Sequence, residues 1–285
     1  MDPAASDWGR RGLVTFYALL AAFLYVPIVV LMIFSFNDSV LVAFPLSGFT
    51  TKWYRQLMEN EQLLAALRSS LVIAAISSVV AVALGVLASY AVVRRRFVAK
   101  GAVTALLLSP LVLPYLVFGI TLLILFRAVD SFLIPRVGIY FGLGTHAIVI
   151  GHAVVSLPYT ILTVVPRLER LSTDVEEAAR DLGASPMSTF RRVTLPLLAP
   201  AILSAYLIAF TLSFDEYAIA SFIAGDVTTY PLYLYGQVRI RIGLPQMIAI
   251  SVIVLLASLV VVVGVEAWRR RAERRLEIGV PRGET

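Results

Sequence analysis

The chain has 285 residues, a net charge of +6 and a mean hydropathy of +0.88, and 59% of its residues are hydrophobic while 15% are charged. Soluble domains are about 45–50% apolar and about 25% charged, so this composition excludes an ordinary soluble enzyme and favours a protein embedded in lipid. The basic residues form short clusters between apolar runs, which argues against nucleic-acid binding, and the absence of cysteine excludes disulfides and thiolate metal sites.

Six apolar stretches have about the 20 residues that a transmembrane helix requires. The first is too long for the apolar region of a cleaved signal peptide and lacks a small-residue cleavage site, so we expect it to be retained. The predicted fold is an all-α polytopic membrane protein with a transmembrane domain at 13–268 and charged tails at 1–12 and 269–285. The predicted spans are 13–36, 68–93, 102–126, 146–166, 197–224 and 246–268.

The Lys and Arg residues predict the orientation of these spans. If the N-terminus lies inside, most of the basic residues between and beyond the spans also lie inside. Positively charged loops favour the cytoplasmic side, so both termini are expected in the cytoplasm.

The outer segment 49–66 places apolar and aromatic side chains four residues apart. Phe49, Trp53 and Leu57 form one such series, and Tyr54 and Met58 form another. This pattern is typical of a short amphipathic helix at the membrane surface. A plain loop is the alternative.

The inner segment 167–195 predicts two helices separated by a sharp turn. Ser172, Thr173 and Asp174 can each cap the first helix, and Gly183 is typical of a helix end or a bend in the chain. Ser185 and Pro186 are suited to start a second helix over about 186–193, and Pro196 opens the fifth span. The apolar residues at helical spacing form either a surface for another protein or a face packed on the chain's own bundle. They are Val175, Ala178, Ala179 and Leu182, followed by Met187, Phe190 and Val193.

The same segment carries a specific motif. Glu177-Ala178-Ala179 is followed after three residues by Gly183, and after nine more by Val193, one residue, and Leu195-Pro196. This pattern resembles the EAA loop of ABC-importer permeases, with valine in place of isoleucine at 193. The resemblance covers nearly the whole chain and implies a type I ABC importer permease fold.

In that family the loop is a coupling helix that lies in a groove of a cytoplasmic ATPase. The resemblance therefore assigns coupling to Glu177 and Gly183, and a close-packed face to Ala178 and Ala179, with Leu195 and Pro196 completing the motif. It implies a multi-pass protein of the bacterial inner membrane. Its implied partners are a second permease, two ATPase copies, a periplasmic or lipid-anchored solute-binding protein, and membrane lipid.

Other segments narrow the resemblance to the smaller permease of spermidine/putrescine importers. They are Gly48–Tyr54, Thr211–Phe222, His146–Pro158 and Thr163–Leu168. The implied solute is a polyamine. The same architecture importing another organic cation, thiamine or iron is the alternative.

The chain lacks the sequence of an ATPase. A P-loop requires Gly-x-x-x-x-Gly-Lys followed by Ser or Thr, and neither Lys52 nor Lys100 lies in such a motif. We therefore expect no enzymatic activity and no cofactor in this chain, with ATP and Mg²⁺ bound by a partner. His146 and His152 are six residues apart and do not share a helical face, so structural roles are favoured over a metal site.

Two acidic residues lie inside the predicted fifth span. A carboxylate at bilayer depth usually faces a wet cavity or a partner. Asp215 and Glu216 point about 100° apart on a helix, so one of them is expected to face a pathway. Phe214 and Tyr217 would place aromatic faces near a cationic solute. An acidic pair at the outer end of the span, without a role in transport, is the alternative.

Prolines are expected to kink two other spans. Pro110 and Pro114 lie in the third predicted span, and Pro158 lies in the fourth. Tyr115 and Tyr159 follow two of these prolines and are candidates to line a pathway. Kinks that serve packing alone are the alternative.

Two other classes of protein remain as rival hypotheses. An ion-coupled secondary transporter would need a coupling site within one chain and often an internal repeat, and neither is evident. An intramembrane enzyme would need a nucleophile or metal motif, and none is present.

Overall fold

The computed structural model describes residues 3–238 and 243–277. Secondary structure in this part of the chain is helical apart from one isolated antiparallel bridge between Asn37 and Phe49. The chain divides into two compact units. One comprises residues 1–61 and 234–261, and the other comprises 62–233 and 262–285.

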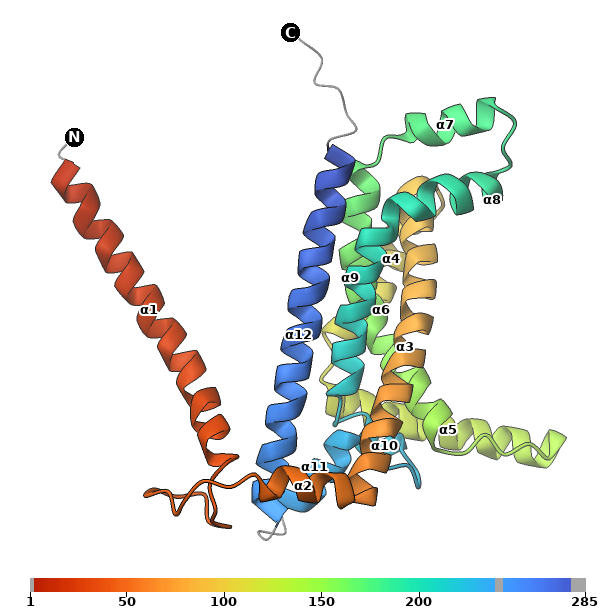
Figure 1. Cartoon of the computed structure of the whole chain (residues 1–285). Coiled ribbons are helices and arrows are strands. Elements are labelled where there is room, and N and C mark those ends of the chain that lie inside the picture. The colour runs from red at the N-terminus through yellow and green to blue at the C-terminus, as the bar shows by residue number, and fades with distance from the viewer. Residues whose placement is uncertain (1–2, 239–242, 278–285) are drawn as a thin grey trace. The chain divides into compact units, whose positions relative to one another are not determined.

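Six helices within the described residues are long and apolar enough to cross a membrane, which confirms the predicted number of spans. Figure 1 shows them as the long coiled ribbons. They are α1 (Pro3–Phe34), α3 (Glu61–Arg94), α5 (Tyr115–Val137), α6 (Thr145–Arg170), α9 (Leu195–Phe214) and α12 (Leu244–Glu277).

The third span lies later in the chain than predicted. The helix α4 (Lys100–Leu108) and a 3₁₀ turn (Ser109–Leu111) come first, and the spanning helix α5 starts only at Tyr115. Pro114 has an extended ψ of 127° and precedes α5 directly. Proline lacks a backbone donor and disfavours helix in the residue before it, so Pro110 and Pro114 interrupt the apolar run that was predicted as one span. Pro158, by contrast, lies within the uninterrupted helix α6.

The first unit contains residues 49–61 of the segment 49–66, including the predicted short helix. This helix, α2 (Lys52–Glu59), is shorter than the predicted range 49–66 because α3 already begins at Glu61. Trp53 and Leu57 are buried, whereas Phe49 and Met58 are exposed. The buried tryptophan donates its Nε1 hydrogen to the backbone oxygen of Asn37 at 2.8 Å.

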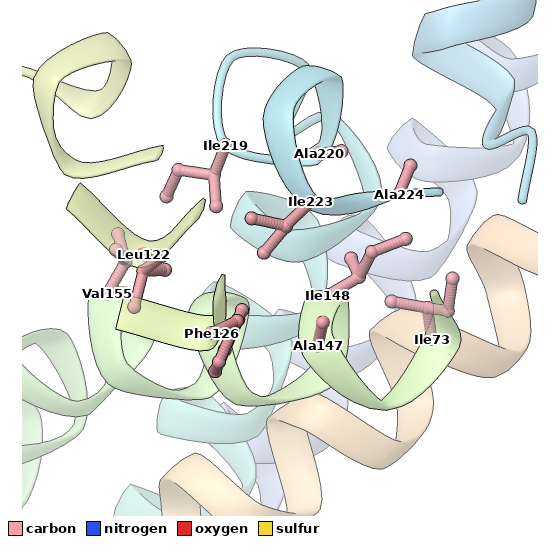
Figure 2. Packing of buried hydrophobic residues seen from close by; sticks show 10 residues of the cluster. All are labelled: Ile73, Leu122, Phe126, Ala147, Ile148, Val155, Ile219, Ala220, Ile223 and Ala224. Carbon is pink, nitrogen blue, oxygen red and sulfur yellow. The ribbon is translucent and has the colours of Figure 1, made fainter. Parts of the chain in front are cut away.

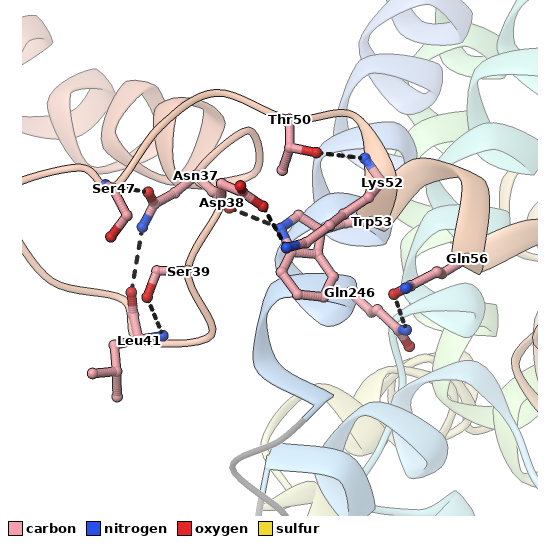
Figure 3. Close-up of polar contacts among 10 residues, drawn as sticks. All are labelled: Asn37, Asp38, Ser39, Leu41, Ser47, Thr50, Lys52, Trp53, Gln56 and Gln246. Carbon is pink, nitrogen blue, oxygen red and sulfur yellow. Dashed lines mark hydrogen bonds and ion pairs between the residues drawn. The ribbon is translucent and has the colours of Figure 1, made fainter.

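Polar contacts hold the loop before α2 in place (Figure 3). The Asn37 side chain accepts from the Ser47 backbone N–H at 3.0 Å and donates to the Leu41 oxygen at 3.3 Å. Lys52 forms an ion pair with Asp38. The loop before α2 therefore has a defined conformation, and because α2 forms within 49–66, that segment is not a plain loop.

The second unit has its main core where α3, α5 and α6 surround a short segment that follows α9. This segment contains α10 (Ala220–Ile223), and α11 (Tyr230–Val238) follows it. Figure 2 shows the buried side chains of the cluster pointing toward one another. They are Ile73, Leu122, Phe126, Ala147, Ile148, Val155, Ile219, Ala220, Ile223 and Ala224.

A second buried cluster packs α3, α6 and α9 together further along the same helices. It comprises Val82, Val86, Val164, Leu168, Leu198 and Ala205. α3 and α6 approach closely beside it, at Gly85. A Cβ atom at this glycine would lie 2.5 Å from Cγ2 of Thr160, which is closer than real Cβ contacts. The packing of α3 on α6 therefore requires a residue without a side chain at this position.

We expect Gly85→Ala to lower the thermal unfolding midpoint of the detergent-solubilised chain. Overpacking of a filled interior costs about 1–3 kcal/mol. Gly264→Ala is the matched control, because a Cβ in that helix meets nothing within 4 Å and alanine is a better helix former. An unchanged midpoint in Gly85→Ala would show that α3 and α6 are less tightly packed than the structure indicates.

Candidate functional site: the coupling loop and the break after α9

The loop between α6 and α9 forms the two helices that its sequence indicates. They are α7 (Thr173–Asp181) and α8 (Pro186–Thr189), and Figure 1 shows both beyond one end of α3, α6 and α9. Ser172 caps α7 by accepting from the Asp174 N–H at 3.1 Å. Ser185 caps α8 by accepting from the Ser188 N–H at 3.3 Å. The two helices therefore start where their capping residues predict.

Gly183 ends α7 with a left-handed backbone. Its φ is +84°, its N–H donates to the Arg180 oxygen at 2.8 Å, and the Ala184 N–H donates to the Ala179 oxygen at 3.0 Å. These bonds satisfy carbonyls that the helix end would otherwise leave free. A Cβ here would meet nothing within 4 Å. The turn therefore requires glycine because of the backbone conformation and not because of crowding.

The second helix does not end near 193 as expected. A π-helical stretch, Phe190–Thr194, joins α8 to α9 without a break, and the Leu195 N–H donates to the oxygen of Phe190. A π-helical turn has hydrogen bonds between residues five apart, and this one lies just before Pro196, which has no backbone N–H to donate. The loop is thus continuous with the fifth span, and a force on α8 would act directly on α9.

Most of the apolar residues of α7 and its turn are exposed. Val175, Leu182 and Met187 have exposed fractions of 50%, 91% and 66%. Glu177 and Ala178 are exposed too, as are Leu195 and Pro196, while Ala179 is partly buried. Phe190 packs against the ring of Tyr90, with centroids 4.9 Å apart. Of the two interpretations left open by the sequence, this exposure favours a surface for another protein on α7.

The second region of interest is the break after α9. The helix ends at Phe214, and Asp215 is exposed whereas Glu216 is buried, with an exposed fraction of 7%. The Glu216 carboxylate accepts from the N–H of Ile219 at 2.9 and 3.0 Å and from the N–H of Ala220 at 3.1 Å. Glu216 therefore orders the turn into α10, and Asp215 is the accessible acid of the pair.

His152 is a buried partner of Glu216 that the sequence did not indicate. Its Nε2 lies 3.2 Å from Oε2 of Glu216, and its Nδ1 lies 2.8 Å from Oγ of Ser213. Ser213 in turn lies 2.8 Å from the hydroxyl of Ser77. His152 is 64 positions from Glu216, so no sequence spacing could have paired them. In the part of the chain that the structure describes, no group of three His or acidic residues could hold a metal ion.

The structure brings two of the predicted aromatic residues, Tyr115 and Tyr159, into contact with each other, whereas Phe214 contacts a residue that was not predicted. The hydroxyls of Tyr115 and Tyr159 lie 3.3 Å apart, and both side chains are partly buried. The ring of Phe214 stacks on Tyr230, with centroids 5.6 Å apart. Tyr217 is partly buried next to the acidic pair.

The described residues thus combine six helices that are long and apolar enough to span a membrane, a buried polar centre and a loop with exposed apolar side chains. Residues 81–278 match the family described as the binding-protein-dependent transport system inner membrane component. The chain belongs to this family, which confirms the resemblance seen in the EAA loop. It is thus a multi-pass transport component of the inner membrane and not an enzyme.

Relatives with curated names match most of the chain. It is 37% identical over 257 residues to the putrescine transport system permease protein PotI of Escherichia coli strain K12, covering 89% of each chain. It is 36% identical over 249 residues to the spermidine/putrescine transport system permease protein PotC of the same strain, covering 87% of this chain and 90% of that protein.

Solved structures share the fold at lower sequence identity. A chain in the crystal structure of a bacterial ABC transporter that imports the acidic polysaccharide alginate matches with a TM-score of 0.70 and 16% identity. The match covers 92% of this chain and 97% of that one. A chain of an amino acid ABC transporter matches with a TM-score of 0.54 and 20% identity, over 78% and 100% of the two chains. These matches confirm the predicted permease fold.

Proposed function

We propose that the chain is a permease subunit of an ATP-driven polyamine importer, with spermidine or putrescine as its solute. The observation that carries this proposal is the similarity to PotI and PotC at 36–37% identity over most of both chains. Both of these relatives are named as polyamine permeases.

The break after α9 supplies a chemical reason for a cationic solute. Asp215 offers an exposed carboxylate at the end of a spanning helix. Phe214 and Tyr217 flank the acidic pair in sequence, and aromatic faces attract ammonium groups. A polyamine carries several ammonium groups, so an acid with nearby aromatic rings complements it.

The chain would form half of the solute pathway, with a second permease as the other half. One copy of a cytoplasmic ATPase would dock on the exposed residues of α7 and its turn, and a second copy would dock on the other permease; both copies would bind ATP and Mg²⁺. A periplasmic or lipid-anchored binding protein would deliver the solute at the outer face. Both termini would lie in the cytoplasm, as the distribution of basic residues predicts.

Uptake of labelled spermidine and putrescine by cells with and without this chain tests the proposal. Uptake should fall when the gene is deleted and return with the wild-type gene. Unchanged uptake would contradict the polyamine assignment while leaving the family membership intact. Uptake that persists when the partner ATPase is inactivated would instead support an ion-coupled transporter.

A further inference from the structure

A buried acid lies next to the exposed Glu177 of the EAA motif. Glu176 is in the first turns of α7 and has an exposed fraction of 3%, whereas the neighbouring Glu177 is exposed. Adjacent helical residues point about 100° apart, so the two acids serve different surfaces. Nothing in the EAA pattern assigns a role to position 176.

The carboxylate of Glu176 is bound from two other elements. Nε of Arg94, the last residue of α3, lies 3.2 Å from Oε1 of Glu176. The Thr194 hydroxyl, at the end of the π-helical stretch before α9, donates to the same oxygen at 3.0 Å. Arg180, one turn along α7, places Nη2 at 3.5 Å from Oε2.

Arg94 also holds the chain just before α7. Its Nη2 donates to the backbone oxygen of Leu171, the C-cap residue that follows α6, at 2.9 Å. The Arg94 side chain is mostly buried, with an exposed fraction of 11%. One guanidinium and one carboxylate thus connect the ends of α3 and α6 with α7 and the start of α9.

Such a contact is hard to break. A buried charge that loses its partner keeps the cost of burial without the compensating attraction. Arg95 and Arg96 follow Arg94 directly but are exposed. Of the three consecutive arginines at this end of α3, Arg94 has a partner inside the protein, whereas the other two are exposed.

We propose that Glu176 and Arg94 are positioning residues that fix α7 to the inner ends of α3 and α9, so that a displacement of α7 moves these spans with it. The inference rests on the proposed docking of an ATPase on α7. The exposed face of α7 would receive the force, and the buried Glu176 would pass it on.

The test uses the assembled complex in proteoliposomes, with Arg94→Gln, Glu176→Gln and the double variant. We expect each single variant to retain the ATPase subunit but to lower the solute transported per ATP hydrolysed by about fivefold or more, the range of a typical coupling between sites. The double variant should be no worse than the poorer single variant, because both changes remove one contact. Arg95→Gln, which removes the same charge from an exposed neighbour, should remain close to wild type.

A second measurement does not depend on the solute. The chain has no cysteine, so Leu87→Cys on α3 and Leu182→Cys after α7 give one pair of spin labels at exposed positions of this chain. The distance is measured on the chain without the ATPase, because Leu182 lies on the proposed docking surface. The distance distribution should broaden in Glu176→Gln and Arg94→Gln and stay narrow in Arg95→Gln. If the wild-type complex transports no polyamine, the polyamine assignment is wrong, but the distance distribution still tests whether Glu176 and Arg94 position α7.

Three results would overturn the inference. The first is an unchanged ratio of transport to ATP hydrolysis together with an unchanged distance distribution. The second is a double variant whose loss of transport per ATP is the product of the two single losses. The third is loss of the ATPase from one single variant but not from the other. If Glu176→Gln does not fold, Thr194→Val removes only the hydroxyl contact and should give a smaller loss in the same direction.

Discussion

Asp215→Asn is expected to reduce polyamine uptake by about tenfold or more at solute concentrations well below saturation, with the chain still present in the membrane at its normal level. A hydrogen bond to a charged group contributes about 1.5–3 kcal/mol, and about 1.4 kcal/mol corresponds to a factor of ten. Asparagine keeps the size of the side chain but removes the charge that attracts an ammonium group. Initial uptake rates in cells with matched amounts of the chain give the measurement.

The adjacent acid provides the contrast. Glu216→Gln neutralises a buried carboxylate that accepts from the Ile219 and Ala220 N–H groups and lies beside His152. Glutamine has one acceptor oxygen where the carboxylate has two, so it leaves a buried N–H group unpaired, which costs about 1–3 kcal/mol. We therefore expect a lower unfolding midpoint and less chain in the membrane, and not a selective loss of transport.

A third variant tests whether removing an exposed acid anywhere in the chain lowers uptake. Glu59→Gln, at the end of α2, should leave both uptake and abundance close to wild type because Glu59 is exposed. A lower abundance of Asp215→Asn would contradict the role assigned to Asp215, and normal abundance with loss of uptake in Glu216→Gln would contradict the role assigned to Glu216.

Gly183→Val is expected to abolish uptake while membrane insertion survives. The glycine has φ +84°, and a left-handed conformation costs other residues about 1–2 kcal/mol, with β-branched residues affected most. This cost is small beside the stability gained by inserting six spans, but it is applied at the turn that sets the direction of α8 relative to α7. Uptake and membrane abundance, measured on the same cells, separate the two effects.

A matched glycine shows whether strain alone explains the result. Gly138, which ends α5, has φ +66°, and a Cβ there would also meet nothing within 4 Å. Gly138→Val imposes the same backbone strain away from the coupling loop and should transport nearly normally. Gly183→Asn should recover part of the activity, because asparagine tolerates this conformation best after glycine. Normal uptake by Gly183→Val would rule out a role for this turn in coupling.

Much of the protein follows from its sequence alone. The bilayer requires long apolar helices, so hydropathy determined the number of spans. Capping residues and a glycine with positive φ act over a few residues, so the loop around Ser172, Gly183 and Ser185 was predictable as two helices and a turn. The spacing of the EAA motif is specific enough to indicate the family by itself.

Tertiary structure decided which side chains of each pair face inward. Asp215 and Glu216 are neighbours, as are Glu176 and Glu177, and the sequence shows that adjacent helical acids point in different directions but not which of the two is buried. Their burial depends on partners far along the chain, His152 for Glu216 and Arg94 for Glu176. Local sequence also could not show that two prolines would divide the third apolar run, whereas α6 continues through Pro158. Local propensities act over a few residues, but burial and ion pairing depend on which helices pack together, and only the folded chain determines that.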